Sequence, residues 1–347
     1  MGGREQGRHP VKTFAETAPT REDVWRSIIL FGRNVASYKF ALGKSLLEFA
    51  GQDRDEVRLE ELAVPFAHHM CDHLKACDKQ GTSAQSRFLD ACRAYNRGEM
   101  TQTQHIEQTA RLGFSNVIDA FHVVNQGDVP IRFFVDERRK SAKGIRLTDE
   151  LRQIREDFQY RNLPAELEAR WRLVETAWDL ALPRHVLAVT YEPDGELLIV
   201  KGGRARRRAI TGSREALNGY QNGQCFYCRR DIEAKHADVD HFLPHTLLPF
   251  DVVANIDGIW NLVLACADCN RGPHGKFARV PELRFLEFLH GRNEFLIGSH
   301  HPLRETLMGQ IGASEPERRS NLQQAWTQAC SILIHTWRPE TEAAPAP

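Results

Sequence analysis

Two pairs of cysteines limit the possible folds of this chain more than any other feature. The segments CFYC (residues 225–228) and CADC (residues 266–269) each hold two cysteines with two residues between them. Each CxxC brings two sulfurs together from one tight turn, and four thiolates fill the tetrahedral shell of Zn²⁺. The spacing therefore predicts a structural zinc site that holds the two ends of a compact module together, with the ligands Cys225, Cys228, Cys266 and Cys269.

The composition favours a soluble protein of a reducing compartment. The chain has eight cysteines, and its polar start, Met1-Gly2-Gly3-Arg4, lacks the apolar core of a secretory signal. In such a chain, thiols serve as metal ligands or small core residues rather than as disulfides. No apolar stretch approaches the ~20 residues that a membrane-spanning helix needs. We expect a cytoplasmic protein without membrane contact. Lys plus Arg equal Asp plus Glu at 46 each, so net charge does not decide on a polyanionic partner.

The length of 347 residues predicts two or three compact units. The patterns of apolar residues indicate an α+β fold, with a mainly α-helical N-terminal region that includes a small β element, a zinc-stabilised module and C-terminal helices. The expected division is a flexible N-terminus (1–15), a helical recognition or regulatory domain (16–200), a basic lead-in with the module (201–280), C-terminal helices (281–339) and a disordered tail (340–347). No motif in residues 1–200 indicates what that domain recognises.

Helical periodicity begins after Thr20, which with Asp23 forms a capping box, and continues to Gly51 with an interruption near Gly32. Ser314 and Glu317 are the expected cap of the last helix. The other predicted helices span residues 55–78, 82–97, 101–112, 164–183, 281–296 and 316–337. Extended segments are predicted at residues 131–135 and 185–200, the second as a hairpin around a turn at residues 192–195.

Three segments of the module resemble the signature parts of the HNH, or ββα-metal, endonuclease family. They are VDHFLP (residues 239–244), WNLVL (260–264) and CNRG (269–272), in the family's order. The resemblance covers roughly residues 220–280. It implies two strands and a helix around one divalent ion, and many members of the family stiffen this unit with two CxxC pairs.

The residue types in these segments suit the hydrolysis of phosphodiester bonds. A histidine with a pKa near ~6.5 can take a proton from the attacking water, so His241 is the candidate general base. Asp240 offers carboxylate oxygen and Asn270 amide oxygen, which are ligands that Mg²⁺ or Mn²⁺ prefers. By resemblance, Asn261 takes the family's middle position, where the side chain holds the loop and orients the base.

Several nearby residues have alternative roles. The third signature position is His in many relatives and Asn in others, so Asn270 fits the second pattern. His274 could replace it from the same helix, at i,i+4 spacing, or from the loop leading into that helix. His245 could contact the scissile phosphate or lie at the surface. Lys276 could be a point-charge contact to phosphate or a solvated lysine.

A basic segment precedes the module. Residues 201–230 hold eight Lys or Arg residues and one acid, Glu215. Because neutralised phosphates supply most non-specific affinity for nucleic acids, this segment is a candidate contact surface, with a solvated linker as the alternative. The candidate contacts to nucleic acid are Arg206, Arg207, Arg208 and Arg271.

One predicted helix is crowded with histidine and cysteine. His69 and His73, and His73 and Cys77, have the i,i+4 spacing that can hold a metal, in a stretch that also contains His68 and Cys71. Most such pairs are incidental. Elsewhere, Cys92 and Cys330 fall in apolar-periodic helices and are interpreted as core residues.

These observations predict a metal-dependent endonuclease that hydrolyses nucleic acid, with DNA as the expected substrate and His241 as the base. The alternative is a non-catalytic zinc-ribbon module that binds nucleic acid or protein. The helical regions could hold a protein partner or a second copy of the chain, since one HNH site cuts one strand. By analogy with relatives, bacterial defence against phage is an expected context.

Overall fold

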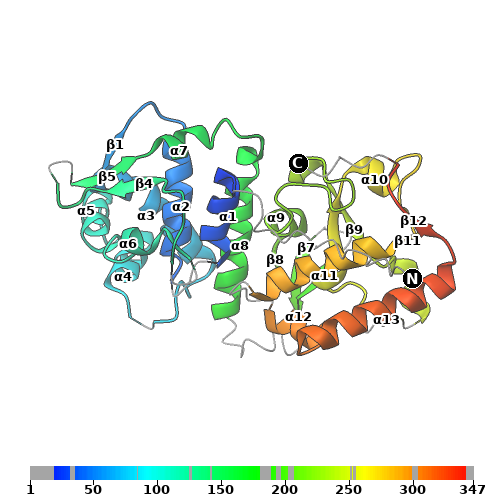
Figure 1. The fold of residues 1–347 in the computed structure, drawn as a ribbon. Helices are drawn as coiled ribbons and strands as arrows, with labels where there is room; N and C mark the ends of the chain where they lie inside the picture. The colour runs from blue at the N-terminus through cyan, green and yellow to red at the C-terminus, as the bar shows by residue number, and fades with distance from the viewer. Residues whose placement is uncertain are drawn as a thin grey trace, which may run out of the picture.

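The structure is a computed structural model that describes residues 19–31, 36–83, 85–124, 127–140, 143–179, 189–192, 197–201, 207–250, 252, 255–298 and 304–340. The mixture of helices and small sheets confirms the predicted α+β class (Figure 1). The expected flexible N-terminus (1–15) lies outside the described residues, as does the tail beyond residue 340. Among the described helices, none combines the length and apolar character that crossing a membrane requires.

The N-terminal lobe comprises the elements from α1 to α8 and is mainly helical. Its helices are α1 (Arg21–Phe31), α2 (Tyr38–Phe49), α3 (Leu59–Ala76), α4 (Arg87–Asn96), α5 (Gln102–Leu112), α6 (Val117–Ala120), α7 (Asp149–Gln153), the 3-10 turn η1 (Phe158–Arg161) and α8 (Leu163–Asp179). An antiparallel sheet in the order β1-β5-β4 is formed by Glu56–Arg58, Gly144–Leu147 and Phe134–Asp136. A short hairpin joins β2 (Val123–Val124) to β3 (Gly127–Asp128).

The C-terminal lobe comprises the elements from β6 to β12. The antiparallel sheet β6-β7-β8 is formed by Val189–Glu192, Leu197–Lys201 and Arg207–Gly212. Strand β9 (Asp238–His241) pairs antiparallel with β10 (Leu262–Ala265), and β11 (Val280–Pro281) pairs parallel with β12 (Thr336–Trp337). The remaining elements are α9 (Ser213–Asn218), η3 (Ala234–His236), η4 (His245–Phe250), η5 (Ile259–Asn261), α10 (Ala267–Arg271), α11 (Leu283–Gly298), α12 (Arg304–Ile311) and α13 (Glu315–Leu333).

Capping residues set the starts of the first and last long helices as predicted. The Thr20 hydroxyl accepts a hydrogen bond from the Asp23 amide, and the Asp23 carboxylate accepts one from the Thr20 amide. Ser314 and Glu317 form the same reciprocal pair before α13. Each box satisfies amide groups that the first helical turn leaves without a partner. The hairpin predicted over residues 185–200 is present as β6 and β7, and its turn (193–196) lies outside the described residues.

Two predicted helices begin later than their apolar pattern suggests. The segment 55–78 starts as strand β1, because Glu56–Arg58 pairs with β5, and only then continues as α3. The segment 82–97 becomes helical at Arg87, where the Ser86 hydroxyl accepts the amide of Leu89 as the N-cap. In both cases a pairing partner or a cap, rather than apolar spacing, fixes the boundary.

Helix α8 belongs to both hydrophobic cores. Leu163, Leu167 and Trp171 pack into the core of the N-terminal lobe, whereas Ala169 and Leu173 pack into the core of the C-terminal lobe. The two sets recur at helical spacing and so lie on different faces of one helix. Figure 1 shows α8 standing between the two lobes.

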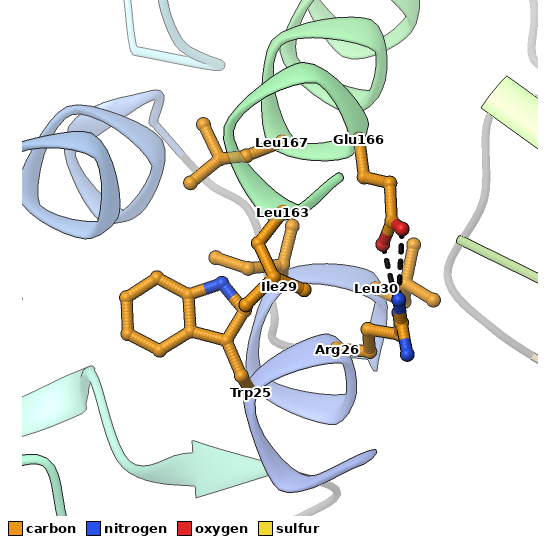
Figure 2. A pocket seen from close by; sticks show the side chains of 7 residues that line it. All are labelled: Trp25, Arg26, Ile29, Leu30, Leu163, Glu166 and Leu167. Atoms are coloured by element: carbon orange, nitrogen blue, oxygen red, sulfur yellow. Dashed lines mark hydrogen bonds and ion pairs between the residues drawn. The ribbon is translucent and has the colours of Figure 1, made fainter. Parts of the chain in front are cut away.

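A buried ion pair joins α1 to α8 where the lobes meet. The Arg26 guanidinium donates to both carboxylate oxygens of Glu166, at 2.8 and 2.9 Å (Figure 2). Glu166 also accepts from the Asn218 side chain of α9 at 2.7 Å. Nearby, Gln159 donates to the Gly223 carbonyl at 3.0 Å, just before the first cysteine pair. The N-terminal lobe therefore supports the loop that leads into the first cysteine pair.

The C-terminal helices support the module from the other side. Arg292 of α11 is buried and donates to the carbonyls of Leu262, Ile259 and Trp260, and Asn293 also donates to Trp260. Burial lowers the pKa of Arg292 to about 9. These bonds satisfy backbone carbonyls of η5 and of the start of β10. Helix α11 therefore holds the backbone of the segment that carries Asn261.

Candidate functional site

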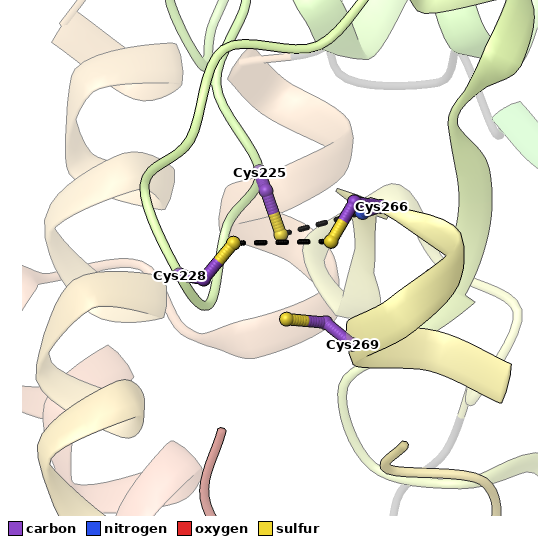
Figure 3. Close-up of side chains that lie close together, drawn as sticks. All are labelled: Cys225, Cys228, Cys266 and Cys269. Carbon is purple, nitrogen blue, oxygen red and sulfur yellow. Dashed lines mark hydrogen bonds between the residues drawn. The ribbon is translucent and has the colours of Figure 1, made fainter. Parts of the chain in front are cut away.

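The four cysteines of the two CxxC pairs converge on one point. Cys225 and Cys228 lie on a loop, Cys266 precedes α10 and Cys269 lies within it, and their sulfurs face one another (Figure 3). All four sulfurs lie within 4.8 Å of each other. The Sγ atoms of Cys228 and Cys266 are 3.8 Å apart. A tetrahedral ion with bonds of ~2.3 Å to sulfur requires about this separation. The cluster can therefore bind a metal such as zinc.

Hydrogen-bond donors surround these sulfurs. The Cys266 amide points at Cys225 Sγ at 3.3 Å, and the Arg230 guanidinium lies 3.4 Å from Cys228 Sγ and 3.7 Å from Cys266 Sγ. Four thiolates around a divalent cation carry a net charge of −2, which N–H donors and a nearby cation stabilise. Arg230, part of the basic segment predicted to contact nucleic acid, thus faces the sulfurs and Asp268 at 2.9 Å.

His241 ends strand β9 directly opposite the start of β10. Its Cα partner is Leu262, and Asp240 pairs with Val263. Helix α10 follows β10 after one residue, so the local order is strand, strand and helix. The His241 side chain is largely buried, with 14% of its surface exposed. Burial lowers the pKa of His241 below its usual value, and the hydrogen bond to Asp257 opposes this shift. The ring is therefore neutral near pH 7.

Asp257 is one of the site residues that sequence reasoning missed. Its carboxylate lies 3.0 Å from His241 Nε2 and 3.6 Å from His245 Nε2. The rings of His241 and His245 are 5.5 Å apart, and His245 is half-exposed at the start of η4. Because a carboxylate only accepts hydrogen bonds, Asp257 favours the ring form that carries a proton on Nε2 of His241. The sequence feature that could have indicated Asp257 is the Asp-Gly turn just before the WNLVL segment.

Asn261 ties together the two loops that carry these groups. Its side-chain amide donates to the carbonyls of Leu243, at 2.9 Å, and Ile256, at 2.8 Å, and its Oδ1 accepts from the Leu243 amide at 2.8 Å. The Asn261 side chain is fully buried. Leu243 follows His241 by two residues and Ile256 precedes Asp257, so Asn261 fixes the distance between the imidazole and its carboxylate partner.

Asp240 is buried and bonded to two side chains from within the module. The Tyr227 hydroxyl donates to Asp240 Oδ2 at 2.6 Å, and the Lys276 ammonium lies 3.1 Å from Asp240 Oδ1. Tyr227 comes from inside the first CxxC, so the cysteine loop delivers this hydroxyl to the carboxylate. Burial raises the pKa of Tyr227 well above its usual value, which keeps the hydroxyl protonated as a donor.

Lys276 differs from its sequence-based interpretation. It was expected as a phosphate contact or a solvated lysine, but its side chain is 0% exposed. The ammonium also donates to the carbonyls of His241, at 2.8 Å, and Phe277, at 3.3 Å. Burial lowers the pKa of Lys276, and Asp240 opposes this. Lys276 is thus the internal counter-charge of Asp240, because the chain turns back after α10 and brings it under β9.

Asn270 and Arg271 of α10 lie against Asp238 rather than Asp240. The Asn270 amide donates to Asp238 Oδ2 at 3.2 Å, and Arg271 forms an ion pair with the same carboxylate at 2.7 Å. Asp238 and Asp240 are two residues apart on β9, so their side chains leave the strand on the same side. Asp238 therefore links β9 to α10, and the sequence analysis had not singled out this residue.

His274 is not positioned as a substitute for Asn270. Helix α10 ends at Arg271, so the i,i+4 geometry assumed for His274 does not apply. Its side chain is 70% exposed and its Nδ1 lies 3.1 Å from a carboxylate oxygen of Glu340. The correction follows from the short helix, because the chain leaves α10 at Gly272 before His274 could turn back toward β9.

The basic segment is described only in part. Arg206 lies outside the described residues. Arg207 and Arg208 belong to strand β8, where they pair with Lys201 and Val200, but their side chains lie outside the description. Arg271 is exposed and paired with Asp238.

The histidine-rich stretch of α3 does not form the metal pairs that its spacing suggested. His68 pairs with Asp72, His69 with Glu48, and His73 with Glu175 and Glu168. His73 also stacks on Trp171, with ring centroids 3.4 Å apart. The partners of these rings are thus carboxylates, from α3 itself for His68 and from neighbouring helices for His69 and His73. Of this stretch, only Cys71 belongs to a cluster of potential metal ligands.

The chain was compared with known proteins at three levels. Neither the family models, nor the curated proteins, nor the solved structures contained a match to it.

Proposed function

We propose that the C-terminal lobe is a metal-dependent endonuclease of the HNH type, which hydrolyses phosphodiester bonds of nucleic acid, with DNA as the preferred substrate. The observation that carries the proposal is the pair formed by His241 and Asp257. A largely buried neutral imidazole lies at the end of a strand and hydrogen-bonds a carboxylate at 3.0 Å. Such a pair has the chemistry of an oriented general base.

In this proposal each residue has its own role. Asp257 holds the orientation of the His241 ring, and His241 accepts a proton from the attacking water. Asn261 fixes the loops that carry both groups through three hydrogen bonds. His245, half-exposed beside Asp257, is a candidate contact for the scissile phosphate. Removing the base from such a site costs about 10²- to 10⁴-fold in rate.

In this proposal the oxygen donors for a hard divalent ion are Asp240 and Asn270, and Asp238, which Asn270 contacts, is a further candidate. When bound, Mg²⁺ or Mn²⁺ stabilises the charge that develops on the phosphate and the leaving oxygen. Both carboxylates already have a cationic partner, Lys276 and Arg271. The donor set is therefore close to neutral, so we expect the ion to bind weakly by itself and to need phosphate oxygens of the substrate as further ligands.

The second candidate is a non-catalytic zinc-ribbon module that binds nucleic acid or protein. The pairing of Asp240 with a fully buried lysine favours it, because a carboxylate neutralised in this way serves the stability of the fold. The His241–Asp257 pair favours the enzyme, because a binding module has no use for a buried imidazole held in one tautomer. We therefore keep the nuclease as the main proposal.

The test compares the full-length protein with its His241→Ala variant on plasmid DNA and on RNA, with Mg²⁺, with Mn²⁺ or with EDTA. We expect metal-dependent cleavage of DNA that falls by about 10²- to 10⁴-fold in the variant. His236→Ala is the matched control, since His236 is 72% exposed on η3 and pairs only with Glu233 among the described residues.

Three outcomes are informative. Cleavage at equal rates by the protein and His241→Ala would refute the assigned base. Binding of DNA without cleavage under any metal condition would support the zinc-ribbon alternative. A preference for RNA would correct the substrate and leave the reaction in place.

A further inference from the structure

Three buried side chains meet in the N-terminal lobe, far along the chain from the zinc module. Cys71 comes from α3, Cys92 from α4 and His105 from α5, and their exposed fractions are 3%, 0% and 2%. His105 Nε2 lies 3.3 Å from Cys92 Sγ and 3.7 Å from Cys71 Sγ. The two sulfurs and an imidazole nitrogen all lie within 4.8 Å of one another.

These distances fit the ligand shell of a thiophilic metal ion. Zinc bonds of ~2.3 Å to sulfur and ~2.0–2.1 Å to nitrogen, at a tetrahedral angle, place S and N about 3.6 Å apart. The two S···N distances bracket this value. The Cys228–Cys266 separation of 3.8 Å in the module shows the same agreement for two sulfurs. Both cysteine clusters are therefore already spaced for a metal.

The simpler interpretation is a core in which thiols act as small apolar residues and hydrogen-bond an imidazole. Two observations favour a metal over this interpretation. Within the described part of the chain, His105 Nε2 has only the two sulfurs as partners, although a buried imidazole nitrogen usually meets oxygen or nitrogen. The Tyr95 ring stacks on His105 with centroids 4.5 Å apart, which fixes the ring plane with Nε2 toward the sulfurs.

The second observation concerns Asn96, one helical turn after Cys92 on the same face of α4. Its amide nitrogen donates to the Cys71 carbonyl at 2.9 Å. Its Oδ1 is buried and has no hydrogen-bond partner among the described residues. A buried carbonyl oxygen without a partner costs about 1–3 kcal/mol, so such atoms usually have a ligand or a water. Asn96 is therefore an available oxygen donor whose side chain already contacts the backbone of Cys71.

We propose that Cys71, Cys92 and His105 bind a second zinc ion, with the oxygen of Asn96, directly or through a water, as the fourth donor. Binding of Zn²⁺ releases the two thiol protons, and two thiolates with a neutral imidazole then give a centre without net charge. Charge neutrality favours Zn²⁺ over Cu⁺ in so buried a place, since Cu⁺ with two thiolates carries −1. The ion joins three helices that pack on one another, and it acts independently of the proposed nuclease.

The experiment measures metal content of the full-length protein, purified without chelator. We expect about two zinc ions per chain, one from each cluster. Cys92→Ser and Cys266→Ser should each lose one of the two. Cys330→Ser is the matched control and should keep both, because Cys330 belongs to neither cluster. Anaerobic loading with Cu⁺ in a parallel sample tests the choice of ion.

X-ray absorption at the zinc edge tests the proposal on the unmodified protein, so the result does not depend on whether a variant folds. One Cys₄ site gives four sulfurs per zinc, whereas the two sites together average about three sulfurs with one nitrogen or oxygen donor. One zinc per chain with four sulfurs would overturn the proposal. A disulfide between Cys71 and Cys92, detected by mass spectrometry without reduction, would also overturn it, and retention of Cu⁺ in preference to zinc would overturn the assigned ion.

Discussion

Replacing Lys276 by Met is expected to destabilise the C-terminal lobe strongly. Met keeps most of the unbranched apolar stem but removes the ammonium, which is the only cation that pairs with Asp240 among the described residues. The carboxylate then stays buried with the Tyr227 hydroxyl as its remaining side-chain donor in that part of the chain. Leaving one partner of a buried ion pair unpaired costs about 3–5 kcal/mol. Urea unfolding of the full-length protein measures this loss.

Two companion variants separate the ion pair from general damage. Adding Asp240→Asn to Lys276→Met removes the unpaired charge, so the double variant should be about 1–3 kcal/mol more stable than the sum of the two single losses predicts. Lys235→Met, at an exposed pair with Glu233, should cost about 1 kcal/mol or less. A Lys276→Met loss as small as that of Lys235→Met would refute the reasoning, because the ammonium would then not be the counter-charge of Asp240.

Three further predictions concern the site and the lobe interface. Asp257→Asn should slow cleavage at least about tenfold. It should also move the acid limb of the kcat/KM profile to lower pH, because the hydrogen bond to Asp257 raises the pKa of His241. An unchanged pH profile would contradict the coupling of these two residues. Cys266→Ser should lose the zinc of the four-cysteine cluster and the folded C-terminal lobe together, which metal analysis and circular dichroism measure. Full stability without that zinc would exclude a structural ion. Arg26→Met should cost about 3–5 kcal/mol of unfolding free energy, with partial recovery on adding Glu166→Gln, and additive losses would show an uncoupled pair.

The sequence predicted those features that depend on neighbours along the chain. Thr20 with Asp23 and Ser314 with Glu317 marked the helix starts because a cap and its partner are three residues apart. The four-cysteine cluster was predictable because each half is a local CxxC motif that brings two sulfurs together from one turn.

Features that depend on distant contacts were not predictable. Lys276 meets Asp240 across 36 residues, and a lysine is buried so rarely that its type alone favours the surface. Asp257 lies in a loop without periodicity, so only the folded chain brings it to His241. Strand β1 has three residues, too few for an alternating pattern to stand out from the helix that follows.

The cluster of Cys71, Cys92 and His105 was also not predictable from the sequence. Cys92 and His105 lie on different helices, and no local motif connects either of them to Cys71. Cys92 was interpreted as a core residue, which its burial agrees with, but its neighbours are an imidazole and a second thiol. Clusters assembled from three helices leave no spacing signature, because the distances between helices depend on packing.

Helix α8 has a consequence for how this protein can be divided. Trp171 belongs to one hydrophobic core and Leu173 to the other. If the chain is cut on either side of α8, one half therefore loses a helix that covers its hydrophobic core. The module with the four-cysteine cluster could therefore not be grafted onto another protein without this helix and a cover for its second face. Recombination between genes would therefore have to transfer the two lobes together with α8, because neither lobe keeps a complete core alone.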